Sequence, residues 1–317
     1  MKPRTLAIVA VLTLGLIAAA VLFVNRPRTY DTRFDTRVAN AAYRSDGPVV
    51  LFDLGHNNSH GPENAYRPFA EMLRHDGYRI ATVKTTLSAE AIGSAAVLIV
   101  ATPRGANETN DQPAFTDEET TAVMHWVEQG GALLLVTDHW PYGLAARLLA
   151  ARFGVEMGGG MAEDPEQHDA ERGPSHLVFS IDNGLLRDHA IVRGRDSAEA
   201  IHRVLTFTGQ SISGPPGSVP FLQLSSTAIE YPPTKPTAEH SSGNVRVNME
   251  YGTPHSAAGR AQAIALEQGA GRVVVLGEAG MLRAQRERGD RLVGMNVPGF
   301  DDRQLALNIV HWLSRAL

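Results

Sequence analysis

Apolar residues of this 317-residue chain gather in short continuous runs that each end abruptly in polar residues. Four such runs stand out, at residues 49–52, 97–101, 133–136 and 273–276. Runs of Val, Ile and Leu without alternation are typical of strands buried on both faces, and such strands form parallel sheets covered by helices. The pattern therefore predicts an α/β fold with a doubly wound, mostly parallel sheet.

Helix signals alternate with these runs. A helix is expected after Gly61, another after the capping box that Thr116 and Glu119 form, and a third over 144–153. The last helix is expected after residues 301–302. Because crossovers between parallel strands are right-handed, we expect the strand at 78–83 beside the first run, followed by the second, third and fourth runs in that order. Residues 262–276 predict a hairpin that ends in the fourth run.

The segment 155–260 breaks the alternation and is interpreted as an inserted irregular and β segment. Its short apolar pieces are separated by turn-rich stretches. Residues 231–236 contain three prolines and predict polyproline II or disorder. We expect residues 230–258 to be the least ordered part of the domain, because they offer little apolar area to offset the entropy of ordering.

The N-terminus predicts a membrane anchor. Residues 6–24 carry no charge, and at 1.5 Å per residue they nearly span a hydrocarbon core of about 30 Å. We therefore expect an anchor, or a cleaved signal peptide, over 1–25, a charged stalk over 26–46 and the α/β domain over 47–317. The flanking charges are balanced, but with a short N-terminal tail we expect Lys2 and Arg4 in the cytosol. This predicts a single-pass bacterial inner-membrane protein whose domain lies on the extracytoplasmic, periplasmic side.

Polar residues follow each apolar run, where a parallel sheet binds its ligands. The candidates for ligand binding are Asp53, His56, Asn57, Asn58, His60, Asp138, His139 and Glu278. Imidazole and carboxylate groups ligate divalent metals, so His56, His60, Asp138 and His139 are also candidate metal ligands. The sequence thus predicts a ligand site, with a divalent metal as one alternative.

Each candidate also has a structural interpretation that the sequence leaves open. Residues 55–61 can form an Asx-rich turn, and Asp138 can cap a helix. Glu278 can accept hydrogen bonds from the amides of Gly280 or Met281. The loops at 206–211 and 294–299 can cover a cleft or can be ordinary turns, and residues 301–304 can bind a ligand or can begin a helix.

Composition excludes several function classes. The formal net charge is −5 without a basic stripe, which argues against nucleic acid as a partner. The chain has no cysteine, so it has no disulfide, no thiolate metal site and no Cys nucleophile. Glycine-rich phosphate-binding motifs and a Gly-x-Ser-x-Gly elbow are also missing, which argues against a nucleotide cofactor and an ordinary serine hydrolase.

The chain resembles the class I glutamine amidotransferase-like superfamily of flavodoxin-like domains. More narrowly, it resembles membrane-anchored bacterial proteins of unknown function related to the group DUF4350. The segments that carry the resemblance lie at 52–58, 126–131, 137–139, 188–194, 277–279 and 308–313, within a total span of about 48–317. The resemblance implies a flavodoxin-like sheet with its cleft at the strand ends. Active amidotransferases of this superfamily use a Cys-His-Glu triad, so the absence of cysteine excludes their glutaminase activity here.

Three functions remain open from the sequence. The first is a membrane-anchored binding domain that holds a small polar ligand or an envelope partner at the strand ends. The second is a metal-dependent or carboxylate-based hydrolase that acts on an extracytoplasmic polar, carbohydrate-like substrate. The third is a scaffold whose cleft stays empty.

Overall fold

The fold is built around a nine-stranded sheet. The computed structural model describes residues 30–105, 112–140, 142–241 and 244–317. Five parallel strands form one half of the sheet in the order β2-β1-β3-β4-β16. Their bounds are Arg79–Val83, Val49–Asp53, Val97–Ala101, Ala132–Val136 and Gly271–Leu276. This order confirms the one expected from the apolar runs.

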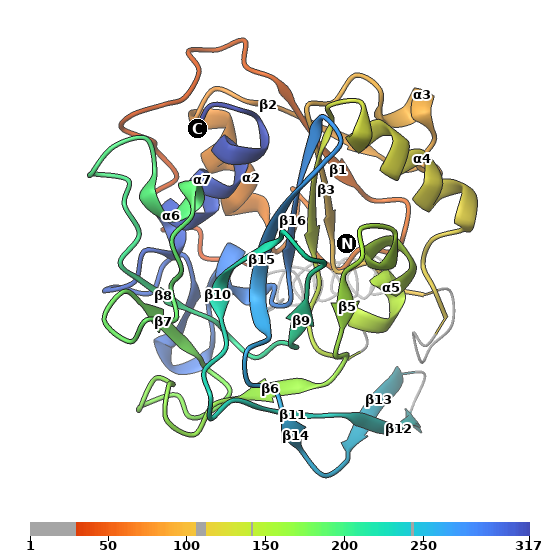
Figure 1. Cartoon of the computed structure of the whole chain (residues 1–317), viewed down its shortest axis with the longest axis vertical. Coiled ribbons are helices and arrows are strands. Elements are labelled where there is room, and N and C mark those ends of the chain that lie inside the picture. Colours follow the sequence, from red (N-terminus) through yellow and green to blue (C-terminus); the bar gives the residue numbers. More distant parts are fainter. Residues whose placement is uncertain (1–29, 106–111, 141, 242–243) are drawn as a thin grey trace, which may run out of the picture.

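Helices cover both faces of the parallel half (Figure 1). One face carries α2 (Arg67–His75), α6 (Ala190–Arg193) and α7 (Asp302–Leu313), and the other carries α3 (Ala89–Ile92), α4 (Asp117–Glu128) and α5 (Tyr142–Arg152). Successive side chains of β3 point to opposite faces of the sheet. Val97 and Ile99 pack in the hydrophobic core on the side of α2 and α7, called the first core, whereas Leu98 and Val100 pack in the second core, on the side of α4 and α5. Burial on both faces explains why these strands are apolar without alternation.

The expectation of a mostly parallel sheet is wrong, because the other half is antiparallel. The chain reverses at Gly269, whose φ of 58° favours glycine, and β15 (Ala261–Gln268) pairs antiparallel with β16. The antiparallel strands β10 (Val219–Gln223), β9 (Ile212–Ser213) and β5 (Glu156–Met157) complete the sheet. The fold is therefore a mixed α/β fold, in which the predicted hairpin turns the sheet from parallel to antiparallel.

Further small antiparallel sheets surround the main one. Their strands are β6 (Met161–Glu163), β7 (Val178–Ser180), β8 (Arg203–Leu205), β11 (Ile229–Tyr231), β12 (Pro233–Ser241), β13 (Asn244–Tyr251), β14 (His255–Ser256), β17 (Ala284–Arg286) and β18 (Leu292–Gly294). The 3-10 turn η1 (Gly280–Leu282) precedes β17, and a second turn, η2 (Arg288–Asp290), connects β17 to β18. The strands β17 and β18 pair with each other.

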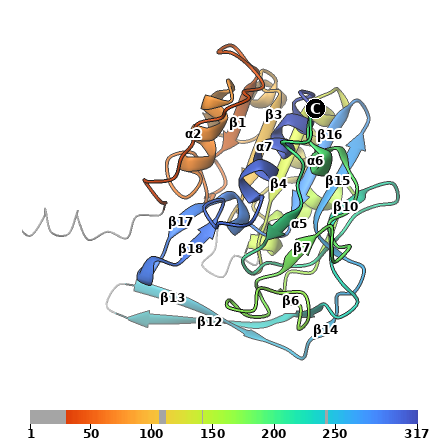
Figure 2. The ribbon, with the colours of Figure 1, turned by 90° about the vertical axis from the view of Figure 1, so that its left-hand side faces the viewer.

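The segment expected to be polyproline II or disordered is a β-hairpin. Strands β12 and β13 pair with each other and project away from the main sheet (Figures 1 and 2). The amide of Gly252 donates to the carbonyl of Pro232 at 2.9 Å and closes the hairpin at its base. Antiparallel pairing with β13 thus decides the conformation of a proline-rich stretch whose composition alone suggested disorder.

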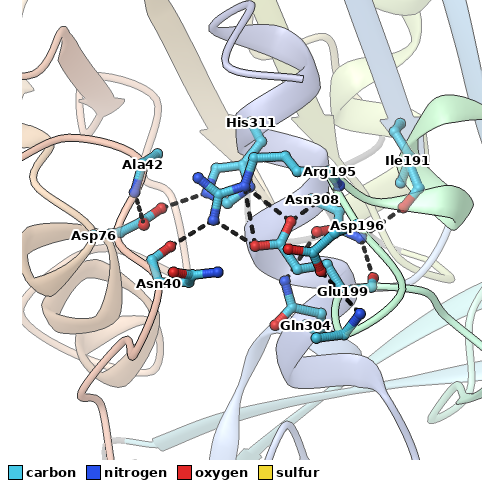
Figure 3. A network of polar contacts seen from close by, with 11 residues as sticks. Asn40, Ala42, Asp76, Ile191, Arg195, Asp196, Glu199, Gln304, Asn308 and His311 are labelled. Atoms are coloured by element: carbon cyan, nitrogen blue, oxygen red, sulfur yellow. Dashed lines mark hydrogen bonds and ion pairs between the residues drawn. The ribbon is translucent and has the colours of Figure 1, made fainter.

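The described part of the expected stalk packs on the domain. Phe34, Val38 and Tyr43 pack against the first core. The amide of Ala42 donates to Asp76 Oδ1 at 2.7 Å, and Asp76 Oδ2 lies 2.6 Å from His311 Nε2 of α7 (Figure 3). Residues 30–46 are therefore joined to α2 and α7 by apolar packing and by a buried polar network.

The expected anchor at residues 6–24 lies outside the described residues. Within the described part of the chain, no helix is long and apolar enough to cross a membrane. The described helices therefore do not support the expected N-terminal transmembrane helix. Nor do they support the expected placement as a single-pass inner-membrane protein with a periplasmic domain.

Candidate functional site

Four neighbouring parallel strands bring the predicted polar residues to one edge of the sheet. Asp53 ends β1, Asp138 follows β4 and Glu278 follows β16, while Thr102 directly follows β3. His60 lies in the loop after β1 and reaches Thr102. The carboxyl ends of β1, β3, β4 and β16, with the side chains that follow them, are called the strand-end site below.

His56 is held between two carboxylates and is not available to a ligand. Its Nδ1 lies 2.8 Å from Asp53 Oδ2, and its Nε2 lies 3.0 Å from Glu119 Oε1. Burial by itself would lower the pKa of His56, but the bonds and charges of Asp53 and then Glu119 raise it overall. Glu119 also forms the expected capping box with Thr116. This ion-paired group fastens the loop after β1 to the start of α4.

The two asparagines of the same loop shape the backbone. Asn57 is exposed and has a φ of 50°, in the left-handed region that Asn tolerates. Asn58 Oδ1 accepts from the amide of His56 at 3.2 Å, and its Nδ2 donates to the carbonyl of Ala101 at 3.3 Å. Asn58 therefore has the structural role that an Asx-rich turn predicts.

Thr102 and His60 form a close pair at the centre of the strand-end site. Thr102 Oγ1 lies 2.6 Å from His60 Nδ1, and Thr102 is fully buried with a φ of 47°. A β-branched residue rarely adopts this conformation, so tertiary contacts must hold it there. Burial, and then the charge of Arg283, lowers the pKa of His60 to about 3, so its imidazole is neutral at pH 7.

Asp138 and Glu278 accept hydrogen bonds from backbone amides. Asp138 Oδ1 accepts from the amide of His139 at 2.7 Å, and its Oδ2 accepts from Ala279 at 3.3 Å. Glu278 accepts from the amides of Gly280 and Met281, as its structural interpretation proposed. Burial raises the pKa of both carboxyl groups, and the charge of Asp138 raises that of Glu278 further.

The predicted metal ligands do not form a metal site. No group of three or more His, Asp or Glu side chains among the described residues is arranged to hold a metal ion. His139 Nδ1 lies 2.8 Å from the carbonyl of Trp140, and its Nε2 lies 3.6 Å from Asp138 Oδ1. Hydrogen bonds thus occupy both nitrogens of His56 and one nitrogen each of His60 and His139.

Arg283 is a residue of the strand-end site that the sequence did not single out. It follows η1, and its charge lowers the pKa of His60, Tyr66 and Asp138, although burial decides the overall shift of each group. Its side chain is partly buried and makes no hydrogen bond or ion pair with the described residues. A partly buried guanidinium normally pairs, so Arg283 gives the site an unpaired positive charge.

Two further groups border the site. The buried Tyr66 donates from its hydroxyl to the carbonyl of Ala279 at 2.9 Å, and its ring lies 4.9 Å from that of His60. Tyr251 lies at the end of β13, and burial followed by the charge of Asp138 raises its pKa. The base of the projecting hairpin thus lies within electrostatic reach of Asp138. No local pattern distinguishes Arg283 or Tyr251 in the sequence.

This arrangement favours binding over nucleophilic catalysis. Thr102 is the hydroxyl nearest to an imidazole at the strand ends, but a base with a pKa of about 3 takes a proton weakly at pH 7. Thr102 is also fully buried. The site therefore offers a positive charge, an imidazole and two carboxyl groups for recognition, without an activated nucleophile among these residues.

Comparisons with known proteins add information on the fold. No protein-family model matches the chain, and no curated protein matches it. The N-terminal domain of mmIFT52 is similar in structure, with a TM-score of 0.58 and 14% identity over 84% of this chain and 97% of that domain. At this identity the similarity shows the fold alone.

Solved ThuA-like proteins, which have the class I glutamine amidotransferase-like fold, are also structural neighbours at low identity. The protein from Bacteroides uniformis ATCC 8492 has a TM-score of 0.42 and 12% identity, over 89% of this chain and 95% of that one. The protein from Parabacteroides merdae ATCC 43184 has a TM-score of 0.41 and 11% identity, over 85% and 90%. No family model supports the narrower resemblance to DUF4350-related proteins.

Proposed function

We propose that this protein binds a small polar ligand with an anionic group at the strand-end site. The unpaired Arg283 guanidinium carries this proposal. Its charge acts on His60 and Asp138, and its side chain has neither a hydrogen bond nor an ion pair within the described part of the chain. A carboxylate or phosphate group of a ligand would accept hydrogen bonds from the unpaired guanidinium of Arg283.

The neighbouring groups suit the rest of such a ligand. The neutral imidazole of His60 and the carboxyl group of Asp138 can recognise hydroxyl groups. Sugar acids combine an anionic group with several hydroxyl groups, and they are therefore the ligand class that we favour. This proposal keeps the polar, carbohydrate-like ligand expected from the sequence and assigns it a binding site without a catalytic step.

The hydrolase alternative has less support. It requires carboxylates or imidazoles that are available to a substrate or a metal. Instead, Glu278 is engaged by two backbone amides, and His56 is enclosed by Asp53 and Glu119. Because the chain has no cysteine, glutaminase chemistry of the Cys-dependent type is excluded as well.

Calorimetric titration with glucuronate tests the proposal, and glucose serves as the neutral probe. We expect glucuronate to bind and glucose to bind at least about tenfold more weakly, which corresponds to about 1.4 kcal/mol. The variant Arg283→Gln should weaken glucuronate binding about tenfold or more. The matched control is Arg44→Gln, because Arg44 is exposed and lies outside the site.

The imidazole of His60 provides a second readout in an NMR titration. Because the charge of Arg283 lowers the pKa of His60, bound glucuronate and Arg283→Gln should each raise it. Equal binding of glucose and glucuronate would overturn the proposal. So would glucuronate binding that is unchanged in Arg283→Gln, or a Kd above about 1 mM for glucuronate.

A further inference from the structure

A cavity lies outside the strand-end site. Its volume is about 600 Å³, within the range of about 300–1,000 Å³ typical of small-molecule sites. The residues that line it come from the segment 31–35, the hairpin of β17 and β18, the loop 295–298 and the start of α7. The loop that the sequence suggested as a cleft cover at 294–299 thus lines this cavity.

One wall of the cavity is polar, and its residues are joined by hydrogen bonds to Asp31. This carboxylate is buried, and it accepts from the amide of Arg33 at 3.0 Å and from Asn296 Nδ2 at 3.2 Å. Arg286 Nη2 donates to it at 3.3 Å. Burial alone would raise the pKa of Asp31, but these bonds and charges lower it overall, so Asp31 is ionised and its charge is compensated within the wall.

Two arginines that line the same cavity are not fully neutralised by neighbouring carboxylates. Arg303 donates to the carbonyl of Arg37 and has no carboxylate within 4.0 Å among residues 30–317 as far as they are described. Arg33 has a side chain that is 68% exposed, and it lies 3.7 Å from Asp31 and 3.9 Å from Asp290. Arg286 pairs with both of these carboxylates, so they neutralise Arg33 only in part. Asp35, which also lines the cavity, is held by Arg37. The cavity therefore has an excess of positive charge.

The remaining wall is apolar, with Phe34, Met295 and Val297 among its residues. The cavity thus has an apolar wall and arginines whose positive charge is only partly neutralised. Such a cavity suits a molecule with a hydrocarbon body and a single anionic group. We propose that this cavity binds a small carboxylic acid with an apolar body. Its carboxylate lies against Arg33 and Arg303, and its hydrocarbon part lies against the apolar wall.

The test is a calorimetric titration of the full chain with 4-phenylbutanoate and, separately, with the neutral 4-phenylbutanamide. The two probes share the same hydrocarbon body and differ in charge. We expect the acid to bind at least about tenfold more tightly than the amide, because charge-assisted hydrogen bonds to arginine are lost with the amide. Arg33→Gln and Arg303→Gln should each weaken binding of the acid about fivefold or more while leaving that of the amide unchanged.

Two variants make the result specific. Arg44→Gln removes an exposed arginine outside the cavity and should leave binding of the acid unchanged. Arg283→Gln should also leave it unchanged, because Arg283 belongs to the strand-end site, so failure of one site is distinguishable from failure of the other. The proposal is overturned if acid and amide bind equally, if both cavity variants bind the acid as the unmodified chain does, or if Arg283→Gln abolishes binding.

Discussion

Thr102 Oγ1 and His60 Nδ1 lie 2.6 Å apart, and this contact joins the end of β3 to the loop that follows β1. Because the imidazole is neutral, the Thr102 hydroxyl can donate its proton to Nδ1. The contact also explains how a β-branched residue stays at a φ of 47°. The pair gives the strand-end site a fixed centre beside the charged Arg283.

Replacing Thr102 by valine tests this pair, because valine keeps the β-branched shape and removes the hydroxyl. Thr102→Val leaves the partly buried imidazole of His60 without its partner, and we expect the free energy of unfolding to fall by about 1–3 kcal/mol. Thr102→Ser keeps the hydroxyl and should cost much less. Urea denaturation measures both values, and equal losses in the two variants would contradict the role of the hydrogen bond.

Removing the imidazole of His56 should be costly, because Asp53 and Glu119 would remain buried without it. We expect His56→Gln to lower the free energy of unfolding by about 3–5 kcal/mol. The folded-state pKa of His56 is raised, so its stabilising contribution is complete below the unfolded pKa of about 6.5 and is lost as the pH rises through the folded pKa.

Denaturation of the unmodified chain and of His56→Gln should therefore be measured at several pH values from about pH 5 upwards. The difference between the two proteins should be largest at the acidic end and should shrink with rising pH. A difference that grows with pH would show that the imidazole is not charged in the folded state.

Asp302 should make the stability of the protein depend on pH in the opposite direction to an ion-paired carboxylate. It is buried, burial raises its pKa well above the usual range, and its Oδ2 accepts from the amide of Leu205 at 3.2 Å. Stability should therefore decline as the pH rises from the unfolded pKa of about 3.9 through the folded pKa. Asp302→Asn should remove this decline and raise the free energy of unfolding at pH 7 by on the order of 1 kcal/mol.

The neighbouring Asp301 is the control for this substitution. Its Oδ2 accepts from the amides of His202 and Arg203 at 2.7 and 3.0 Å at an exposed position. We expect Asp301→Asn to destabilise the protein, because charge-assisted hydrogen bonds are weakened. A loss of stability for Asp302→Asn equal to that for Asp301→Asn would contradict the neutral state of Asp302.

Chelation should not affect the protein. Hydrogen bonds occupy both ring nitrogens of His56 and Nδ1 of His60, and no metal-binding group is formed by the described side chains. We expect the unfolding temperature to be the same before and after dialysis against EDTA. Elemental analysis that finds one divalent metal per chain, together with a lower unfolding temperature after dialysis, would restore the metal hypothesis.

The projecting hairpin of β12 and β13 should contribute little to global stability, because these strands pair with each other alone. An isolated two-stranded hairpin is marginally stable in water. Replacing residues 234–250 by a short Gly-Asn-Gly turn, with Tyr251 retained, should change the free energy of unfolding by less than about 1 kcal/mol. Urea denaturation provides the value, and a larger loss would reveal that the hairpin packs on the domain.

The sequence predicted the parallel half of the sheet because burial on both faces leaves a strong local pattern. Apart from the predicted hairpin, the antiparallel half was missed, since strands of two residues such as β5 and β9 are too short to show a period. Similarly, the charges of residues 26–46 suggested a stalk and masked the apolar contacts of Phe34 and Val38.

The candidate site was predicted in part. Asp138, Glu278 and His60 were placed at the correct edge because parallel strands end together. Thr102 and Arg283 were missed as site residues, because a conformation with positive φ and an unpaired guanidinium arise from tertiary contacts that leave no local signal. Glu119 was identified as a capping residue, but its contact with His56 spans 63 positions of sequence.

The reversal at Gly269 also has a kinetic consequence. Strands β15 and β16 are adjacent along the chain, so their pairing closes a very short loop and can form early in folding. Pairing β16 with β4 must instead bring residues 132–136 to residues 272–276 across the whole intervening segment. That closure costs more entropy than closing the hairpin, so β16 should pair with β4 late in folding. Because the cost grows only with the logarithm of segment length, this pairing should tolerate long additions to the surface strands in between.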